Sequence, residues 1–373
     1  MSALPDGRLL TFYGDDFTGS AAVMELMSFA GLPTVLFTDI PSPAELKRFE
    51  HCRAIGIAGV ARSRSPAWMD AQLPRVFQAL AALGAPINHY KTCSTFDSAP
   101  HVGSIGRAID LAVPALGGAW HPLLVAAPAI QRYQLFGNLF AVVDGEGYRL
   151  DRHPTMAHHP VTPMHEADVR VHLARQTERP IGLVDYLALN AGRGDAVLAD
   201  ARAESAAIVA IDVIDEAGLA AAGRLIWENR GERLFAAGSQ GVEYALLAHW
   251  RAAGLIGDAP PRKLAQHARI AAVSGSCSPV TARQIAWAEA NGFAAIRLDA
   301  VAAVDEQRWL PALDAALDQA VTAFKAGMSP LIYSASGPAD PSVAALVAAT
   351  RAAGLDAETV NARIGQGLGK LLK

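Results

Sequence analysis

The sequence predicts an α/β protein with two domains, each a mostly parallel sheet flanked by helices. The chain has 373 residues, which is more than twice the usual domain length of roughly 150 residues. Short apolar or β-branched runs alternate with longer stretches patterned as helices, and this alternation is typical of parallel sheets covered by helices. Hydrophobic residues make up 51% of the chain and charged residues 18%, so each domain can bury a large core.

The first domain is expected over residues 1–252. Its strands are predicted at 9–13, 34–37, 54–60, 123–126, 181–184, 207–213 and 234–237. Its clearest helices are predicted at 19–30, 66–83 and 241–252. Residues 137–177 fit the alternation least well, and they contain His153, His158, His159 and His165.

A linker is predicted at 253–265, because two prolines and two glycines there make a continuing helix improbable. The second domain is then expected over 266–373. Its strands are predicted at 270–273, 294–298 and 331–334, and its helices begin near 279, 306, 341 and 362. Doubly wound sheets usually have about five or six strands, so this domain is expected to be incomplete at its C-terminal end.

Composition excludes several classes of partner. Lys and Arg number 32 against 36 Asp and Glu, a net charge of -4, so the chain lacks the basic field that holds a nucleic acid. No apolar run reaches the ~18 residues of a membrane helix, and the first residues lack a secretion signal. The three cysteines are scattered and suit a reducing compartment. We therefore expect a cytoplasmic protein without nucleic-acid or membrane partners.

Two adjacent acids, Asp15 and Asp16, follow the first predicted strand directly. The carboxyl ends of parallel strands border the crevice in which α/β sheets bind ligands. A carboxylate in that position can accept a hydrogen bond from a substrate hydroxyl or hold a metal ion. The alternative is a simple helix start capped by Asp16 or Thr18, which accounts for one acid but not for both.

A lysine lies among short hydroxyl side chains at the end of another predicted strand. Residues 88–98 read Asn-His-Tyr-Lys-Thr-Cys-Ser-Thr-Phe-Asp-Ser, with the cation at Lys91. A cation beside several hydroxyls can bind a carboxylate or a polyol. An ordinary polar loop is the alternative interpretation.

The second domain opens with a strand, a turn of small residues at 274–278, and a helix with Pro279 at its first position. Free N–H groups and the positive end of the helix dipole make such a turn an anion site that fits a phosphate. A plain capped turn is the alternative. The turn at 238–241 has a similar pattern, although a helix cap explains it more simply.

Other signatures fail on inspection. Residues 365–370 superficially resemble a P-loop, but the glycine spacing is wrong and Leu371 replaces the required Ser or Thr. No GxGxxG motif follows the first strand, so a nicotinamide cofactor is not supported. Prolines interrupt the histidine-rich segment, which does not favour a zinc site.

Taken in order, these segments resemble the four-carbon acid sugar kinase family, whose members phosphorylate tetronates and related oxo acids with ATP. The matching segments cover nearly the whole chain and are 15–19, 62–65, 90–98, 102–106, 152–156, 159–164 and 274–281. The form Cys-Ser-Thr-Phe-Asp at 93–97 looks more like the branch that acts on 3-oxo acids.

The resemblance implies an ATP- and Mg²⁺-dependent kinase that phosphorylates a terminal hydroxyl of a small four-carbon or branched sugar acid, such as a 3-oxo-tetronate. The first domain would bind the acid and the second the nucleotide. One of Asp15 and Asp16 would be the catalytic base. The residues implied to hold the acid are Arg64, Lys91, Ser94 and Thr95. The residues implied to approach the nucleotide are Gly275, Ser276 and Ser278.

The sequence departs from the family at its C-terminal end. The resemblance implies a further strand and a Gly-rich phosphate loop, which the residues up to Lys373 lack. We therefore expect either a truncated chain or an impaired kinase. The alternative function is a non-catalytic sugar-acid-binding protein without a nucleotide site. An uncovered outer strand can also pair with a strand of another chain. A homodimer is therefore one expected outcome.

Overall fold

The computed structural model describes residues 3–159, 161–257 and 265–373. The chain divides into a larger unit, Met1–Arg262, and a smaller unit, Lys263–Lys373. The predicted linker at 253–265 includes residues 258–264, which lie outside the described residues.

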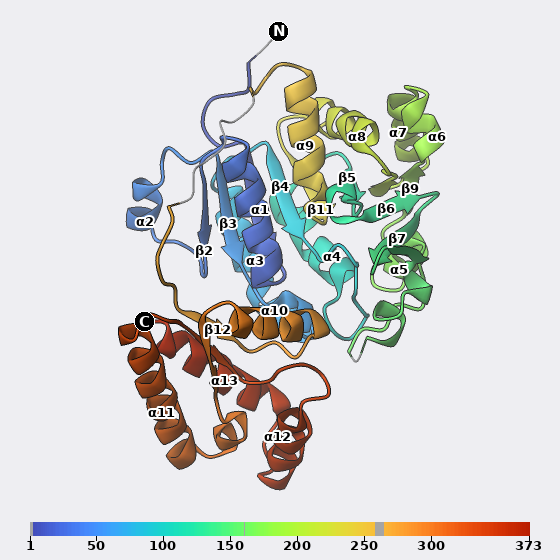
Figure 1. Cartoon of the computed structure of the whole chain (residues 1–373). Helices are drawn as coiled ribbons and strands as arrows, with labels where there is room; N and C mark the ends of the chain where they lie inside the picture. The colour runs from blue at the N-terminus through green and yellow to red at the C-terminus, as the bar shows by residue number, and fades with distance from the viewer. Residues whose placement is uncertain (1–2, 160, 258–264) are drawn as a thin grey trace. The chain divides into compact units, whose positions relative to one another are not determined.

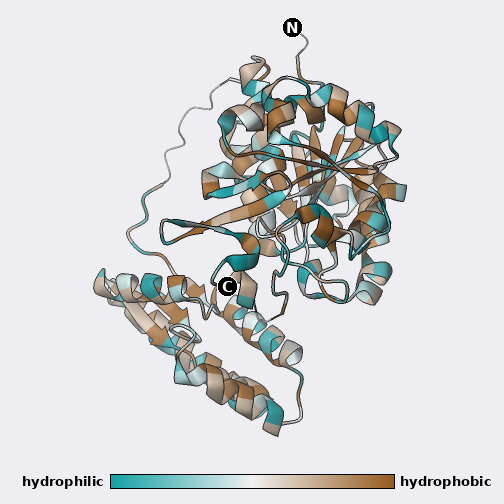
Figure 2. Cartoon of the chain, turned by 90° about the vertical axis from the view of Figure 1, so that its right-hand side faces the viewer, coloured by the Kyte–Doolittle hydropathy of each residue, from teal (hydrophilic) through white to brown (hydrophobic). Residues whose placement is uncertain are grey.

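The larger unit contains an eight-stranded parallel sheet with the order β2-β3-β1-β4-β11-β5-β10-β9. Figure 1 labels these strands, which are β1 (Leu10–Gly14), β2 (Thr34–Phe37), β3 (Ala54–Ala58), β4 (Ile87–Lys91), β5 (His121–Leu124), β9 (Ile181–Val184), β10 (Ile208–Ile211) and β11 (Leu234–Gly238). The central strands are buried on both faces, which explains their continuous apolar runs. Figure 2 shows this hydrophobic colouring along the sheet.

Helices cover both faces of this sheet. One core lies under α1 (Phe17–Phe29), α6 (Tyr186–Asn190), α7 (Gly194–Ala203), α8 (Glu216–Glu228) and α9 (Gly241–Ala252). The opposite core lies under α3 (Pro66–Ala81), α4 (Ile105–Leu116) and α5 (Val169–Leu173). Figure 1 shows α1 and α9 next to each other on the same face. A short helix, α2 (Pro43–Arg48), follows β2 and starts with a capping box at Ser42 and Glu45.

A small antiparallel sheet that was not predicted begins just before the segment 137–177, which fitted the alternation least well, and continues into it. It consists of β6 (Arg132–Leu135), β7 (Asn138–Val143) and β8 (Glu146–Arg149). The turn between β7 and β8 is Asp144-Gly145, with φ values of 51° and 83°, and Asp-Gly is a strong signal for such a hairpin. The buried Asp212 carboxylate accepts hydrogen bonds from the backbone N–H groups of Phe136 and Gly137, which ties this sheet to the end of β10.

The smaller unit contains a three-stranded parallel sheet with the order β12-β14-β13. Its elements are β12 (Ala272–Ser274), α10 (Pro279–Ala290), β13 (Phe293–Arg297), α11 (Glu306–Lys325), β14 (Ser329–Tyr333), α12 (Pro341–Ala352) and α13 (Ala357–Leu371). Trp309, Ile332 and Leu368 belong to its core. Gly367 allows α13 to approach closely, since a Cβ atom there would lie 2.5 Å from the Trp309 ring.

The predicted fold class is confirmed, because both units are mostly parallel sheets flanked by helices. The expected incompleteness of the second unit finds no support. The helix at its end, α13, packs Val360, Ile364 and Leu368 into the same core as the strands. Across the described ranges, no helix is both long and apolar enough to cross a membrane.

Candidate active site

The carboxyl ends of β1 and β4 lie side by side, with Gly14 paired to Lys91. The chain leaves β1 for a helix on one face of the sheet, and it leaves β4 for a helix on the other face. Such a change of direction creates a topological switch point, where open α/β sheets bind their ligands. The two motifs that the sequence singled out, at Asp15-Asp16 and after Lys91, therefore meet at one edge of the sheet.

Arg62 joins the two acids. Its Nη2 lies 2.9 Å from Asp15 Oδ1, and its Nη1 lies 3.0 Å from Asp16 Oδ2. Burial raises the pKa of the Asp15 carboxyl to about 6, although the charge of Arg62 opposes this shift. The Asp15 side chain is 3% exposed and the Asp16 side chain 28%, so Asp16 is the acid that a solute can reach.

Asp16 is also the N-cap of α1, because its Oδ1 accepts a hydrogen bond from Gly19 N at 2.7 Å. Lys91 lies at the same helix start. A Cβ atom on Gly19 would be 2.5 Å from Asp16 Oδ1 and 2.8 Å from Lys91 Nζ. The Lys91 residue is only 2% exposed, and its ammonium donates to the Thr92 carbonyl. Asp15, Asp16, Arg62 and Lys91 thus form one compact cluster of two anions and two cations.

The loop after β4 carries the predicted acid-binding hydroxyls. Ser94 and Thr95 are both buried. The Thr95 hydroxyl donates to Asp97 Oδ1 at 2.6 Å, so it serves first to orient that carboxylate. Phe96 adopts a left-handed φ of 54°, which is uncommon for a bulky side chain. Its buried ring packs against His172, which holds the loop in this conformation.

Arg64 lies beside Trp68, with its guanidinium carbon 5.7 Å from the ring centroid. Sequence reasoning selected this arginine and missed Arg62, although both belong to the same motif. A short turn at Ala61–Ser63 determines which of the two arginines reaches the acids. In this turn Arg62 N donates to the Asp15 carbonyl at 3.1 Å. That backbone contact points the Arg62 side chain to the acids, and no pattern in the sequence reveals it.

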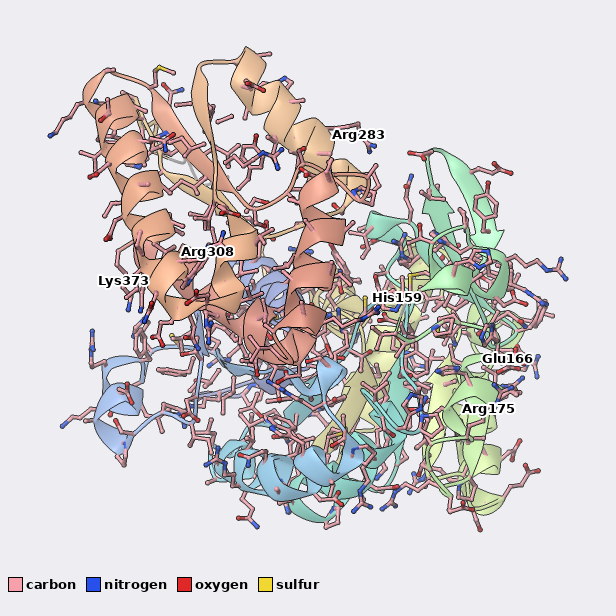
Figure 3. All side chains as sticks on the ribbon, turned by 90° about the horizontal axis from the view of Figure 1, so that it is seen from below. His159, Glu166, Arg175, Arg283, Arg308 and Lys373 are labelled. Atoms are coloured by element: carbon pink, nitrogen blue, oxygen red, sulfur yellow. The ribbon has the colours of Figure 1, made fainter. Side chains whose placement is uncertain are left out.

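Two histidines of the histidine-rich segment organise turns. His153 Nδ1 accepts hydrogen bonds from two backbone N–H groups, and His159 Nδ1 also accepts from two, those of Val161 and Thr162. His159 is labelled in Figure 3. The Thr162 hydroxyl lies 3.4 Å from Asp97 Oδ2, so this segment supports the loop after β4.

In the smaller unit, a cavity of about 460 Å³ lies at the carboxyl ends of β12 and β14. Of the three predicted residues, Gly275 lines this cavity. Ser276 and Ser278 form the turn beside it: Ser276 Oγ accepts from Ser278 N at 3.2 Å, and Ser278 caps α10 by accepting from Thr281 N at 3.1 Å. The turn therefore presents a helix start with a neutral cap.

The rest of the cavity combines an apolar wall with a few polar groups. Its lining includes Ser334, Ser342, Leu346, Val347, Asn361, Ile364 and Leu368. An apolar pocket with few polar groups is typical of a small-molecule site. Sequence reasoning missed the second turn, 334–342, although its strand, serine and helix-starting proline repeat the pattern of 274–279.

Comparison with known proteins covers both units. Residues 10–246 match a family described as a sugar-binding N-terminal domain, and residues 271–373 match one described as a nucleotide-binding C-terminal domain. The chain is 53% identical to the 3-oxo-isoapionate kinase of Paraburkholderia graminis, covering 100% of this chain and 79% of that protein. It is 30% identical to the 3-oxo-tetronate kinase of Pseudomonas fluorescens, covering 96% of this chain and 80% of that protein.

A solved structure from Salmonella typhimurium LT2 has the same architecture, with a TM-score of 0.76 and 21% identity over 97% of this chain and 83% of that chain. At that identity the likeness concerns the fold alone. The family matches and the two kinases concern the sequence itself, and they span both units. The chain therefore belongs to the four-carbon acid sugar kinase family.

Proposed function

We propose that this sugar acid kinase transfers the terminal phosphoryl group of ATP to a hydroxyl of a branched 3-oxo sugar acid of the 3-oxo-isoapionate type. The observation that carries the proposal is the 53% identity to a 3-oxo-isoapionate kinase over the whole chain, against 30% for the 3-oxo-tetronate kinases. A 3-oxo-tetronate is the second candidate substrate.

The cluster at the end of β1 and β4 supplies the chemistry that such an acid needs. Lys91 and Arg62 together would neutralise two charges, that of the substrate carboxylate and that of the transferred phosphoryl group. Neutralising the phosphoryl charge is a main task of a protein in phosphoryl transfer. Asp16, the more exposed acid, would accept the proton of the attacking hydroxyl as its oxygen bonds to phosphorus and ADP leaves. Asp15 would hold Arg62 in place.

The loop after β4 would complete the acid site. Ser94 and the Thr95–Asp97 pair follow Lys91 directly, and Arg64 would contribute a further cation from the neighbouring loop. Hydroxyl and carboxylate groups of this kind distinguish the hydroxyls and the carbonyl of a sugar acid by hydrogen bonding.

The cavity of the smaller unit would hold the nucleoside of ATP, with the phosphates at the turn formed by Gly275, Ser276 and Ser278. In the part of the chain that the structure describes, no three carboxylate, imidazole or thiol groups converge as a metal site. In the proposed reaction Mg²⁺ would be held mainly by phosphate oxygens and water, as is usual for Mg²⁺ with nucleotides. Mg²⁺ would neutralise phosphate charge during transfer.

A coupled ADP-release assay on this chain tests the proposal. We expect ADP release from Mg-ATP that depends on added 3-oxo-isoapionate, with a lower kcat/KM for 3-oxo-tetronates. Preference for a 3-oxo-tetronate would transfer the assignment to the second candidate. The rival function, a sugar-acid-binding protein without catalysis, predicts a thermal shift with the acid but neither ADP release nor a thermal shift with Mg-ATP.

A further inference from the structure

Two strand-to-helix turns stand side by side in the smaller unit. One joins β12 to α10, and the other joins β14 to α12. Both helices have 12 residues and begin with a proline, Pro279 and Pro341. Their caps differ in charge, because the N-cap of α10 is the neutral Ser278 and that of α12 is Asp340.

Asp340 is almost fully enclosed by donors. Its Oδ2 accepts from Ser336 N, Ser336 Oγ and Arg297 Nη1, each at 2.8 Å, and its Oδ1 accepts from Ser342 N at 2.9 Å. Its side chain is 3% exposed. The hydrogen bond from the backbone N–H of Ser336 contributes most to holding the pKa of this carboxyl well below its usual range. Asp340 is therefore ionised at neutral pH.

The segment that Asp340 holds, residues 334–340, forms one wall of the cavity. Ser334 and Ala335 line the cavity from this segment, and Ser342 lines it from the first turn of α12. Gly337 has a φ of 117°, and a Cβ atom there would be 3.2 Å from Ala282 Cβ on α10. The segment therefore contacts both the cavity and the first turn of α10, so a shift of the segment would change both.

The difference in caps decides where an anion can lie. The positive end of a helix attracts phosphate groups. At α12 this end already faces the Asp340 carboxylate, which also occupies the N–H groups of Ser336 and Ser342. At α10 the N–H groups of Ser276, Ser278 and Thr281 donate only to uncharged serine hydroxyls. An incoming triphosphate would therefore meet the Asp340 carboxylate at α12 but only neutral groups at α10.

We propose that Asp340, fixed by Arg297, is a positioning residue for the nucleotide: it closes the start of α12 to phosphate and holds residues 334–340 as the cavity wall. The triphosphate then lies at the α10 turn while the nucleoside enters the cavity. This inference rests on the proposed function, in which the smaller unit binds ATP. It adds that Asp340 sets the direction in which the nucleotide binds.

The test compares ATP with inorganic tripolyphosphate, which has the phosphates but no nucleoside. Both are titrated calorimetrically into the full chain and into Asp340→Ser, which keeps a capping hydroxyl and removes the charge. Selectivity is the ratio of the tripolyphosphate dissociation constant to the ATP dissociation constant. We expect this selectivity to fall at least tenfold in Asp340→Ser, because the wall loosens and the repelling charge is lost.

Asp305→Ser is the matched control, since Asp305 caps α11 in the same unit by accepting from Gln307 N at 2.9 Å and does not line the cavity. It should lose the thermal stability that its single cap hydrogen bond provides and keep its selectivity within twofold. Arg297→Met should reproduce part of the loss, with the KM for the sugar acid unchanged in both Asp340→Ser and Arg297→Met.

An unchanged selectivity in a folded Asp340→Ser protein would overturn the inference. So would an equal loss of affinity for both titrants, because that result indicates a purely structural role. If the wild-type chain binds no ATP, the proposed function fails together with this inference. If wild type binds ATP and the variant keeps its selectivity, only this inference fails.

Discussion

Asp15 and Arg62 set the pH range in which the site works. The pKa of the Asp15 carboxyl lies near 6, so below that pH the group becomes neutral and loses its hold on the Arg62 guanidinium. We expect kcat/KM to fall by about tenfold for each pH unit below 6. Arg62→Met should move this fall to higher pH, because Arg62 lowers the Asp15 pKa. A pH profile of kcat/KM measures both effects.

Unfolding does not explain this expected loss. Because the folded-state pKa of Asp15 is raised, its contribution to folding stability is present at low pH and is lost as pH rises through about 6. Activity and this contribution therefore change in opposite directions. The control is Arg64→Met, which should raise the KM for the acid without moving the pH profile. An identical shift in both variants would contradict the role given to Arg62.

Asp16 is expected to be the essential general base of the reaction. Asp16→Asn keeps the size of the side chain and an oxygen that can accept from Gly19 N, so α1 should remain capped. Loss of a general base usually costs about 10²–10⁴ in rate. We therefore expect kcat to fall by that factor while calorimetry shows unchanged ATP binding. A folded variant with wild-type turnover would remove Asp16 from the mechanism.

Lys91 is expected to bind the acid rather than ATP. Removing a charged hydrogen-bond partner costs about 1.5–3 kcal/mol, which corresponds to a rise in KM of roughly ten- to more than a hundredfold. Lys91→Met should therefore raise the KM for the acid strongly and leave the KM for ATP nearly constant. If only the ATP constant changed, Lys91 would belong to the phosphate site.

At the scale of elements, the start of α1 depends on the small size of Gly19. Replacing a helical glycine by alanine ordinarily stabilises a helix by about 1 kcal/mol. At Gly19, however, the new methyl group would collide with Asp16 Oδ1 and Lys91 Nζ. Gly19→Ala should therefore lower kcat/KM at least tenfold and also lower the melting temperature, because the methyl group displaces the Asp16 cap of α1.

Gly369→Ala in α13 is the matched control, because nothing lies within 4 Å of a Cβ atom there and Gly369 does not line the cavity of the smaller unit. It should be stabilising and fully active. If Gly19→Ala kept wild-type kcat/KM, the start of α1 would not need the open space that the glycine provides. Both measurements require only thermal melts and the coupled assay.

At the scale of the whole molecule, the sequence predicts the parallel strands well because most of them are short, largely apolar runs between helix-patterned stretches. The strands predicted at 270–273 and 331–334 are observed as β12 and β14. The antiparallel sheet β6–β8 was missed because its strands are mostly only partly buried and lie outside the βα pattern. The Asp144-Gly145 turn was the local signal that could have revealed it.

The site was predicted less completely, for a physical reason. Asp15, Asp16 and Lys91 were identified because they directly follow strands, so sequence order alone brings them to one edge of the sheet. Arg62 and Asp340 act through side-chain contacts to residues on other elements. Such contacts depend on the packing of loops, which local patterns do not specify. The predicted homodimer stays a prediction.

The two substrates are expected to bind to different units, and a double variant tests this division. Changes at distant sites that share no partner usually add within about 0.3–0.5 kcal/mol. We expect Lys91→Met to weaken binding of the acid alone, Asp340→Ser to weaken binding of ATP alone, and the double variant to show both losses unchanged. Calorimetry with each ligand separately measures these constants. Weaker binding of ATP to Lys91→Met, measured without the acid, would show that the cluster in the larger unit also contributes to the nucleotide site.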